Sequence, residues 1–253
     1  MLPKTFLKVA ITFAFLLNLA DVYGQDNSQN KQYKNVIRYN ISNPLLFGFD
    51  RYVVLGYERV INDNQSISIN VGRASLPRLV TINTDSFHLN KDTKNSGYNL
   101  SIDYRFYLQK ENKYAAPHGI YIGPFYSYNH FDRDNSWTLN HENGNNELVT
   151  TNTKFDIQTF GFELGYQFIF WKRLTLDLVL VGPGVADYKL KTTIDQDLAP
   201  DNKQQLQDAI EQLLTQKFPG MNYVFADKEF KADGTIGTWS VGYRYLIHIG
   251  FAF

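Results

Sequence analysis

The sequence predicts an all-β fold: an eight-stranded, antiparallel, up-and-down transmembrane β-barrel with one helix in its last long loop. Three observations lead to this prediction. The chain repeats a segment of about ten residues in which apolar and polar side chains alternate. The connections between these segments are alternately short and long. Finally, aromatic residues make up 15% of the 253 residues, although the formal net charge is zero.

Composition excludes several classes of protein. The 25 basic and 25 acidic residues balance, whereas a nucleic-acid-binding protein shows a basic excess. We therefore expect no nucleic-acid partner. The chain also has no cysteine, which excludes a disulfide scaffold, a thiolate metal site and a cysteine nucleophile.

The amino terminus has the features of a secretory signal over residues 1–24. Lys4 and Lys8 precede an apolar run from Val9 to Ala20, and small residues follow before Gln25. This run is shorter than the roughly 20 residues that a membrane-spanning helix needs. We expect a cleaved signal peptide (1–24), a flexible segment (25–34) and a barrel (35–253), with the mature protein exported.

The segment from Tyr98 to Leu108 shows the alternation most clearly. Tyr98, Leu100 and Ile102 share one face with further apolar residues, and Asn99, Ser101, Asp103 and Arg105 share the other. Successive side chains of a strand point to opposite faces, so this segment is a strand with one apolar and one polar face. Eight such strands are predicted, over 36–41, 52–61, 66–72, 98–108, 118–131, 160–168, 174–180 and 239–253.

The connections support a barrel of the outer-membrane type. Residues 62–64, 109–117 and 171–173 form short turns, whereas 42–50, 74–96, 132–147 and 188–235 form long loops. An even number of strands places both chain ends at the short-turn rim. We expect a bend or bulge at Gly182-Pro183-Gly184, where glycine tolerates unusual backbone angles.

The polar faces of the strands indicate which face is inside. An eight-stranded barrel has little interior space, and the many Phe and Tyr side chains of the apolar faces would not fit there. The polar faces carry nearly balanced charges and no lysine, and charges in a narrow lumen must pair. The predicted lumen network consists of Arg38, Glu58, Asp103, Arg105, Glu163, Asp177 and Arg244. By contrast, Arg133 is expected in a loop.

The carboxy-terminal strand, SVGYRYLIHIGFAF, carries aromatic residues at alternate positions before the last residue. It resembles the assembly signal of Gram-negative outer-membrane barrels, with Tyr245, Phe251 and Phe253 at the matching positions. The segments GIYIGPFYSYNHF and GYQFIFWKRLTLDLVLVGPGV, together with the Gly-Tyr-Glu strand, resemble an uncharacterised family of small eight-stranded barrels of the OmpA/OmpX type. The resemblance implies a fold, an outer-membrane location, and two partners, the membrane lipid and the barrel-assembly machinery. It implies no activity.

Residues with catalytic or ligand-binding chemistry are sparse. The five histidines have no metal-ligand spacing, and His248 lies on the polar face, where a hydrogen-bonded lumen residue is expected. Ser127 and His130 raise the alternative of a lipid A acyl hydrolase, but three residues apart in a strand they fall on opposite faces. We therefore predict no catalytic, cofactor or metal residues, and hence a non-enzymatic structural or surface-interaction protein. A soluble periplasmic ligand-binding barrel, with its apolar faces inward, is the remaining alternative.

The last long loop contains a predicted helix over 201–217. Leu206, Ile210, Leu213 and Leu214 recur at helical spacing on an otherwise polar segment. The stripe favours packing on neighbouring loops over a role as a lid or recognition helix. A surface partner that contacts loop 188–235 is a further expectation.

Overall fold

The computed structural model describes residues 33–75, 87–108, 110–140, 146–195, 198–217 and 234–253. The predicted signal peptide and nearly all of the segment 25–34 lie outside these residues. Within them the chain forms eight strands and two helices: β1 (Asn35–Asn40), α2 (Ser42–Phe47), β2 (Tyr52–Asn62), β3 (Gln65–Ala74), β4 (Phe87–Tyr107), β5 (Gly119–Asn140), β6 (Asn146–Phe170), β7 (Leu174–Ile194), α3 (Pro200–Lys217) and β8 (Thr235–Ala252).

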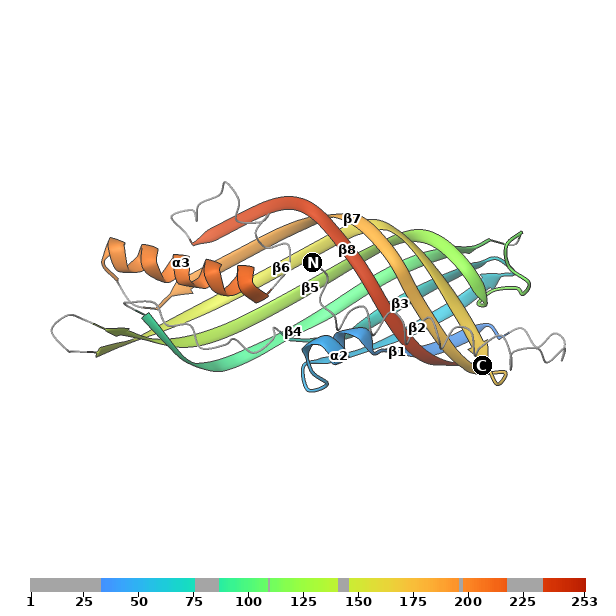
Figure 1. Cartoon of the computed structure of the whole chain (residues 1–253), viewed down its shortest axis with the longest axis horizontal. Coiled ribbons are helices and arrows are strands. Elements are labelled where there is room, and N and C mark those ends of the chain that lie inside the picture. Colours follow the sequence, from blue (N-terminus) through green and yellow to red (C-terminus); the bar gives the residue numbers. More distant parts are fainter. Residues whose placement is uncertain (1–32, 76–86, 109, 141–145, 196–197, 218–233) are drawn as a thin grey trace, which may run out of the picture.

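The strands close into an antiparallel barrel in which each strand pairs with its sequence neighbours and β8 pairs with β1 (Figure 1). The amide of Asn35 donates to the carbonyl of Phe253 at 3.1 Å, and the amide of Phe253 donates back to Asn35 at 2.9 Å. The start of β1, the end of β8 and the three short turns all lie at one rim of the barrel. This confirms the predicted eight-stranded up-and-down fold.

The barrel is much taller on one side than on the other. β1, β2 and β3 have 6 to 11 residues, whereas β4 to β7 have 21 to 25. A five-stranded curved sheet of β4 to β8 therefore continues beyond the ends of β1 to β3 (Figure 1). We call this part the extension.

The extension corrects the sequence prediction of long loops, since β4 begins at Phe87, β5 and β6 cover most of 132–147, and β7 continues to Ile194; the range 188–235 otherwise contains α3. The reason is that the alternation continues there in the opposite sense. On β5 the inward side chains Phe131, Trp137 and Leu139 are apolar and buried, with the buried polar Arg133 and Asn135 between them, and the outward residues of this stretch are polar. Below the extension most inward side chains are polar instead. The reversal makes the repeat harder to recognise, although each strand is continuous.

A hydrophobic core fills the concave side of the extension. It consists of Tyr52, Ala74, Leu89, Phe131, Trp137, Leu139, Val149, Phe155, Leu190, Leu206, Ala209, Ile210 and Ile236. Three of these residues belong to α3, which agrees with the helix predicted over 201–217 and with its predicted packing role. Leu213 and Leu214 of the predicted stripe have side chains outside the described set.

A second helix, α2, was not predicted, because the sequence analysis assigned 42–50 to a loop. Asn40 accepts a hydrogen bond from the backbone amide of Asn43 at 3.2 Å, which satisfies one of the free donors at the start of the helix. Pro44 suits the first turn, and Gly48 after the helix has φ 107° and ψ 139°, a positive-φ conformation that glycine tolerates. Six residues with local caps are too short to produce a helical repeat in the sequence.

β7 contains an irregularity next to the predicted bend. Its register against both β6 and β8 shifts just before Gly182, at Leu180 and Val181. Asp177 and Val179 face the lumen before the shift, and Gly182 and Ala186 face inward after it. The extra residue therefore changes which positions of β7 face inward.

Candidate functional site

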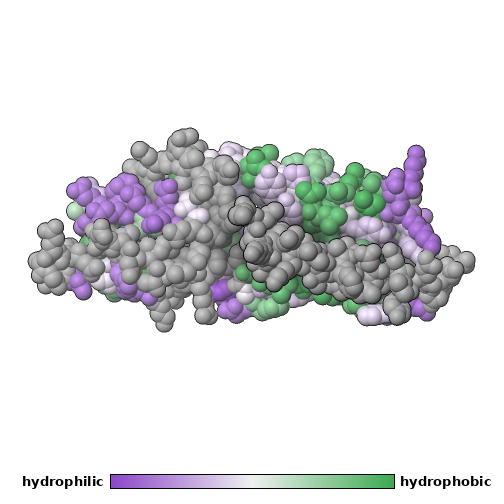
Figure 2. All heavy atoms as spheres, viewed as in Figure 1, coloured by the Kyte–Doolittle hydropathy of each residue, from purple (hydrophilic) through white to green (hydrophobic). Residues whose placement is uncertain are grey.

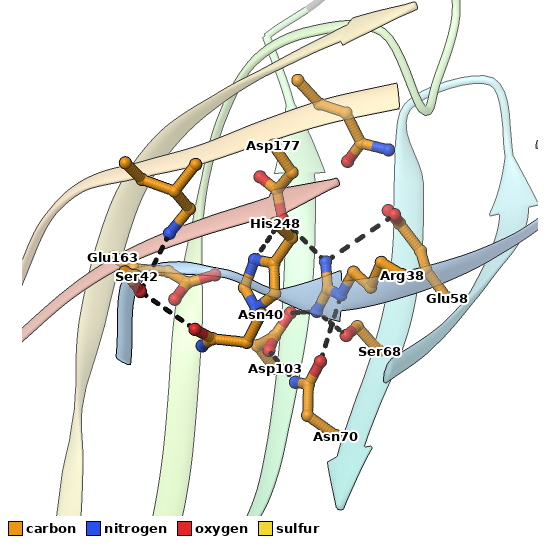
Figure 3. A network of polar contacts seen from close by, with 12 residues as sticks. Arg38, Asn40, Ser42, Glu58, Ser68, Asn70, Asp103, Glu163, Asp177 and His248 are labelled. Carbon is orange, nitrogen blue, oxygen red and sulfur yellow. Dashed lines mark hydrogen bonds and ion pairs between the residues drawn. The ribbon is translucent and has the colours of Figure 1, made fainter. Parts of the chain in front are cut away.

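The seven charged residues expected in the lumen lie together inside the barrel. They come from β1, β2, β4, β6, β7 and β8, and each is buried, with at most 7% of the residue exposed. Side chains from opposite walls meet across the lumen, as the close-up around Arg38 shows (Figure 3). We refer to Arg38, Glu58, Asp103, Arg105, Glu163, Asp177 and Arg244 as the lumen network.

Arg105 has the most contacts in this network. Its Nε donates to Asp103 at 2.8 Å, one terminal nitrogen donates to Asp177 at 2.9 Å, and the other donates to Gln167 at 3.0 Å. The guanidinium also lies 4.3 Å from the ring centroid of Tyr121. A planar guanidinium with five N–H donors suits such multidentate binding. Arg105 therefore links β4 to β6 and β7 across the barrel.

Arg38 and Arg244 connect the remaining strands to the same carboxylates. Arg38 donates to Asp177 at 2.8 Å and to Asn70 at 3.1 Å. Arg244 donates to the second oxygen of Asp103 at 3.1 Å and lies 3.4 Å from Glu163. Asp177 is thus shared by two arginines, and Asp103 by three, because Arg38 also lies 3.5 Å from it. Such shared pairs compensate charges that would be costly to bury alone.

Uncharged polar side chains complete the network. The hydroxyl of Tyr121 donates to Asp177 at 2.7 Å, and Glu58 accepts hydrogen bonds from Ser66 at 2.6 Å and Tyr107 at 2.9 Å. His248 lies 3.2 Å from Asp177, on the lumen side where the sequence placed it. With β3 and β5 included, all eight strands contribute side chains. Five network residues were not predicted from the sequence, although each occupies an inward position of its strand's alternation: Ser66, Asn70, Tyr107, Tyr121 and Gln167.

The outer face of the barrel is apolar over the strands nearest the short-turn rim. Large side chains exposed there include Leu55, Ile69, Leu100, Ile102, Ile122, Phe160, Phe162, Val241, Tyr243, Tyr245, Ile249, Phe251 and Phe253. Figure 2 shows hydrophobic residues gathered towards that rim and hydrophilic residues over α3 at the other end. We call this region the apolar belt. The three residues of the predicted assembly signal, Tyr245, Phe251 and Phe253, belong to it.

The outer surface changes from apolar to charged over two successive rows of outward residues that are paired across the strands. In the last apolar row, the paired outward residues from β4 to β8 are Ile102, Tyr126, Phe160, Val185 and Val241. The next row is mixed: Leu100, Tyr128, Gln158, Asp187 and Trp239. The two rows beyond it contain Tyr98, His130, Asp156, Lys189 and Gly237, and then Ser96, Asp132, Lys154, Lys191 and Thr235. We call these two rows the charged rows.

Both faces of the sheet therefore change character at the same level. Below the charged rows the outside is apolar, and the inside holds the lumen network together with a few apolar side chains such as Val36, Val60 and Phe125. Above the charged rows the outside is polar and the inside is the hydrophobic core of the extension. The arrangement above the charged rows is the one that sheets in water adopt. The arrangement below the charged rows is the reverse.

Ser127 and His130 do not form a catalytic pair. Ser127 lies on the inward face of β5 with Phe125 and Phe131, and His130 lies on the outward face. Nδ1 of His130 is 2.7 Å from Asp156, which also accepts a hydrogen bond from Tyr128 at 2.7 Å. The nucleophile and base of the hydrolase alternative are thus separated by the wall of the barrel.

Arg133 corrects the sequence analysis, which expected it in a loop. It lies within β5, faces inward in the extension and is 2% exposed. Its Nε donates to Asn135 at 3.0 Å. Among the described residues, no group of three or more potential ligand residues is placed to hold a metal ion, and no helix of that part of the chain is long and apolar enough to cross a membrane.

Comparison with known proteins gives little beyond these observations. No family model matches the chain, and no curated protein matches it. A search of solved structures finds the crystal structure of CarO from Acinetobacter baumannii, at 10% identity and a TM-score of 0.37, covering 89% of this chain and 100% of that one. This likeness is too slight to place the chain in a family.

Proposed function

We propose that the protein is a non-enzymatic β-barrel of the bacterial outer membrane. In this proposal the apolar belt faces lipid, the lumen network holds the barrel wall together, and the extension with α3 stands outside the membrane. The barrel is similar in strand number to small barrels of the OmpA/OmpX type, as the sequence resemblance implies. The resemblance brings no specific activity.

The observation that carries the proposal is the reversal of both faces at the charged rows. A soluble barrel with its apolar faces inward would keep one arrangement over its whole height. A membrane barrel needs an apolar outer band about 25 Å tall, bounded by aromatic residues. On β4 the outward residues from Tyr98 to Phe106 are apolar or aromatic. This length matches the roughly 9–11 residues with which a tilted strand crosses a bilayer.

The lumen network favours a structural role over a large pore. Eight strands leave room for little more than their own side chains. Here three arginines and four carboxylates form ion pairs across that space, with Glu58 the most distant of the carboxylates from its arginine partners. We therefore expect no large conductance from the purified protein in a planar lipid bilayer. Stepwise openings of porin size would contradict the closed-lumen part of the proposal.

The membrane part of the proposal is tested by extraction and gel migration. We expect the protein to stay in the membrane fraction after a high-salt wash, to require detergent for extraction, and to migrate differently on gels before and after boiling. A folded protein recovered from the soluble periplasmic fraction would favour the ligand-binding alternative instead.

A lipid-modifying enzyme remains the second hypothesis, with the His130–Asp156 pair on the outer face as its only supporting contact in the described chain. The test is release of acyl chains from purified lipid A. Release that His130→Ala abolishes would overturn the non-enzymatic proposal, whereas the absence of release supports it.

A further inference from the structure

We propose that Lys154 and Lys191 form a binding site for the phosphate groups of a lipid headgroup, on the outer face of the barrel. This inference rests on the proposed membrane location and adds a ligand class to it.

The two lysines are direct cross-strand neighbours. Lys154 on β6 pairs with Lys191 on β7 in the antiparallel ladder, and both side chains are exposed on the outward face. The Cβ atoms of directly opposite residues are about 4.5–5.5 Å apart, and like charges in this position repel each other. An anion bound by both ammonium groups removes this repulsion.

The neighbouring carboxylates already have other partners. Asp187 pairs with Lys189 at 3.0 Å, and Asp156 accepts hydrogen bonds from Tyr128 and His130. The two acids of β5 are shared in the same way: Asp132 accepts from Asn152 at 2.8 Å and lies 3.6 Å from Lys94, and Asp134 accepts from Asn152 at 2.6 Å. Within the described chain, no ion pair within 4.0 Å involves Lys154 or Lys191. Lys154 faces Asp132 across the β5–β6 ladder and therefore shares this one carboxylate with Lys94, whereas Lys191 has no carboxylate directly opposite it on either neighbouring strand.

The position of the pair identifies the anion. Lys154 and Lys191 lie in the second charged row, one row beyond Tyr98 and two rows beyond Trp239. Tyrosine and tryptophan mark the boundary between hydrocarbon and headgroups in membrane barrels. The row beyond them is at the level of the headgroups, where phosphate is the concentrated anion. Lysine binds phosphate as a point charge, so two adjacent lysines suit a phosphorylated lipid.

The test uses the full-length protein purified in a neutral detergent, with diphosphoryl lipid A as the probe and native mass spectrometry as the readout. The variant is the double substitution Lys154→Gln and Lys191→Gln. The control is Lys110→Gln and Lys113→Gln, which removes two exposed charges at the opposite rim. All four residues are exposed, so neither change should prevent folding.

We expect the Lys154/Lys191 variant to bind the probe about tenfold more weakly than the parent or more, and the control to bind it as the parent does. The parent should lose most of this affinity when the probe is dephosphorylated. Equal binding by both double variants would overturn the proposal.

Two further outcomes separate the sources of failure. Full displacement of the probe by millimolar inorganic phosphate would show a site for free phosphate and would overturn the lipid assignment. A protein that stays folded and monomeric after detergent removal would overturn the membrane location itself. Failure of the lysine site alone, in a protein that still requires detergent, leaves the membrane location standing.

Discussion

Replacement of Arg105 by methionine removes the guanidinium that makes the most contacts in the lumen network. Arg105 is fully buried and donates to Asp103, Asp177 and Gln167 within 3.0 Å. Methionine keeps a flexible side chain of comparable length but no donor. Asp177 then keeps only Arg38, Asp103 keeps Arg244 and the more distant Arg38, and the lumen charge falls by one unit.

The expected size of the effect follows from this burial. Removal of one partner from a buried ion pair destabilises a protein by about 3–5 kcal/mol, because an uncompensated charge stays behind. The matched control is Arg73→Met on the outward face of β3, where the side chain is exposed. An exposed arginine contributes about 0–1 kcal/mol. Arg133, which the sequence placed in a loop, does not serve as this control because it is buried in β5.

The assay is equilibrium unfolding by urea in lipid vesicles, followed by tryptophan fluorescence and by the gel shift on boiling. We expect Arg105→Met to lower the free energy of unfolding by several kcal/mol more than Arg73→Met. Addition of Asp177→Asn to Arg105→Met should recover about 0.5–3 kcal/mol, since it removes one stranded charge. Equal free energies of unfolding for the two single variants would refute the assignment of the lumen network as the main polar support of the barrel.

Three further predictions test other parts of the structure. Gly165→Ala should destabilise the barrel by about 1–3 kcal/mol in the same urea assay, because the added Cβ would overlap the ring of Tyr121; unchanged stability would contradict this packing. Leu206→Ala should expose α3 to protease, whereas the exposed Gln204→Ala should not, because only Leu206 is buried in the core of the extension; equal cleavage rates would count against it. Burial in the turn before β5 lowers the pKa of His118 to about 4. Between about pH 6.5 and 4 the unfolded chain therefore binds a proton that the folded chain does not. The contribution of His118 to stability is present above about pH 6.5 and is lost as the pH falls towards 4. An imidazole titration by NMR with a midpoint near 6.5 would disprove the burial.

The sequence predicted the lower barrel well because one physical rule controls it. A strand with one apolar and one polar face repeats with period two, and the positions of Arg38, Asp103 and Arg244 follow from that repeat alone. Which arginine meets which carboxylate depends on the stagger between strands. That stagger includes the register shift in β7, which no local pattern specifies.

The extension was missed for a different reason. Its inward residues, such as Trp137 and Leu190, are apolar, so the faces exchange character along a continuous strand. If the apolar face is assumed to stay on the same side along the whole strand, the residues beyond the exchange no longer fit the alternation and are assigned to a loop. The charged rows are the signal that could have shown the change, since Lys154 and Asp156 stand at alternate positions directly before the apolar run from Phe160.

The central claim is that the apolar belt faces lipid, and tryptophan quenching by lipids with brominated acyl chains tests it most directly. Two single-tryptophan proteins are compared, with the other native tryptophans replaced by phenylalanine. One carries Phe162→Trp in the belt, where Phe162 is 63% exposed, and the other keeps Trp137, which is fully buried inside the extension. We predict strong quenching of the tryptophan at position 162 and almost none of Trp137. Equal quenching of the two, or no quenching at position 162, would contradict the claim.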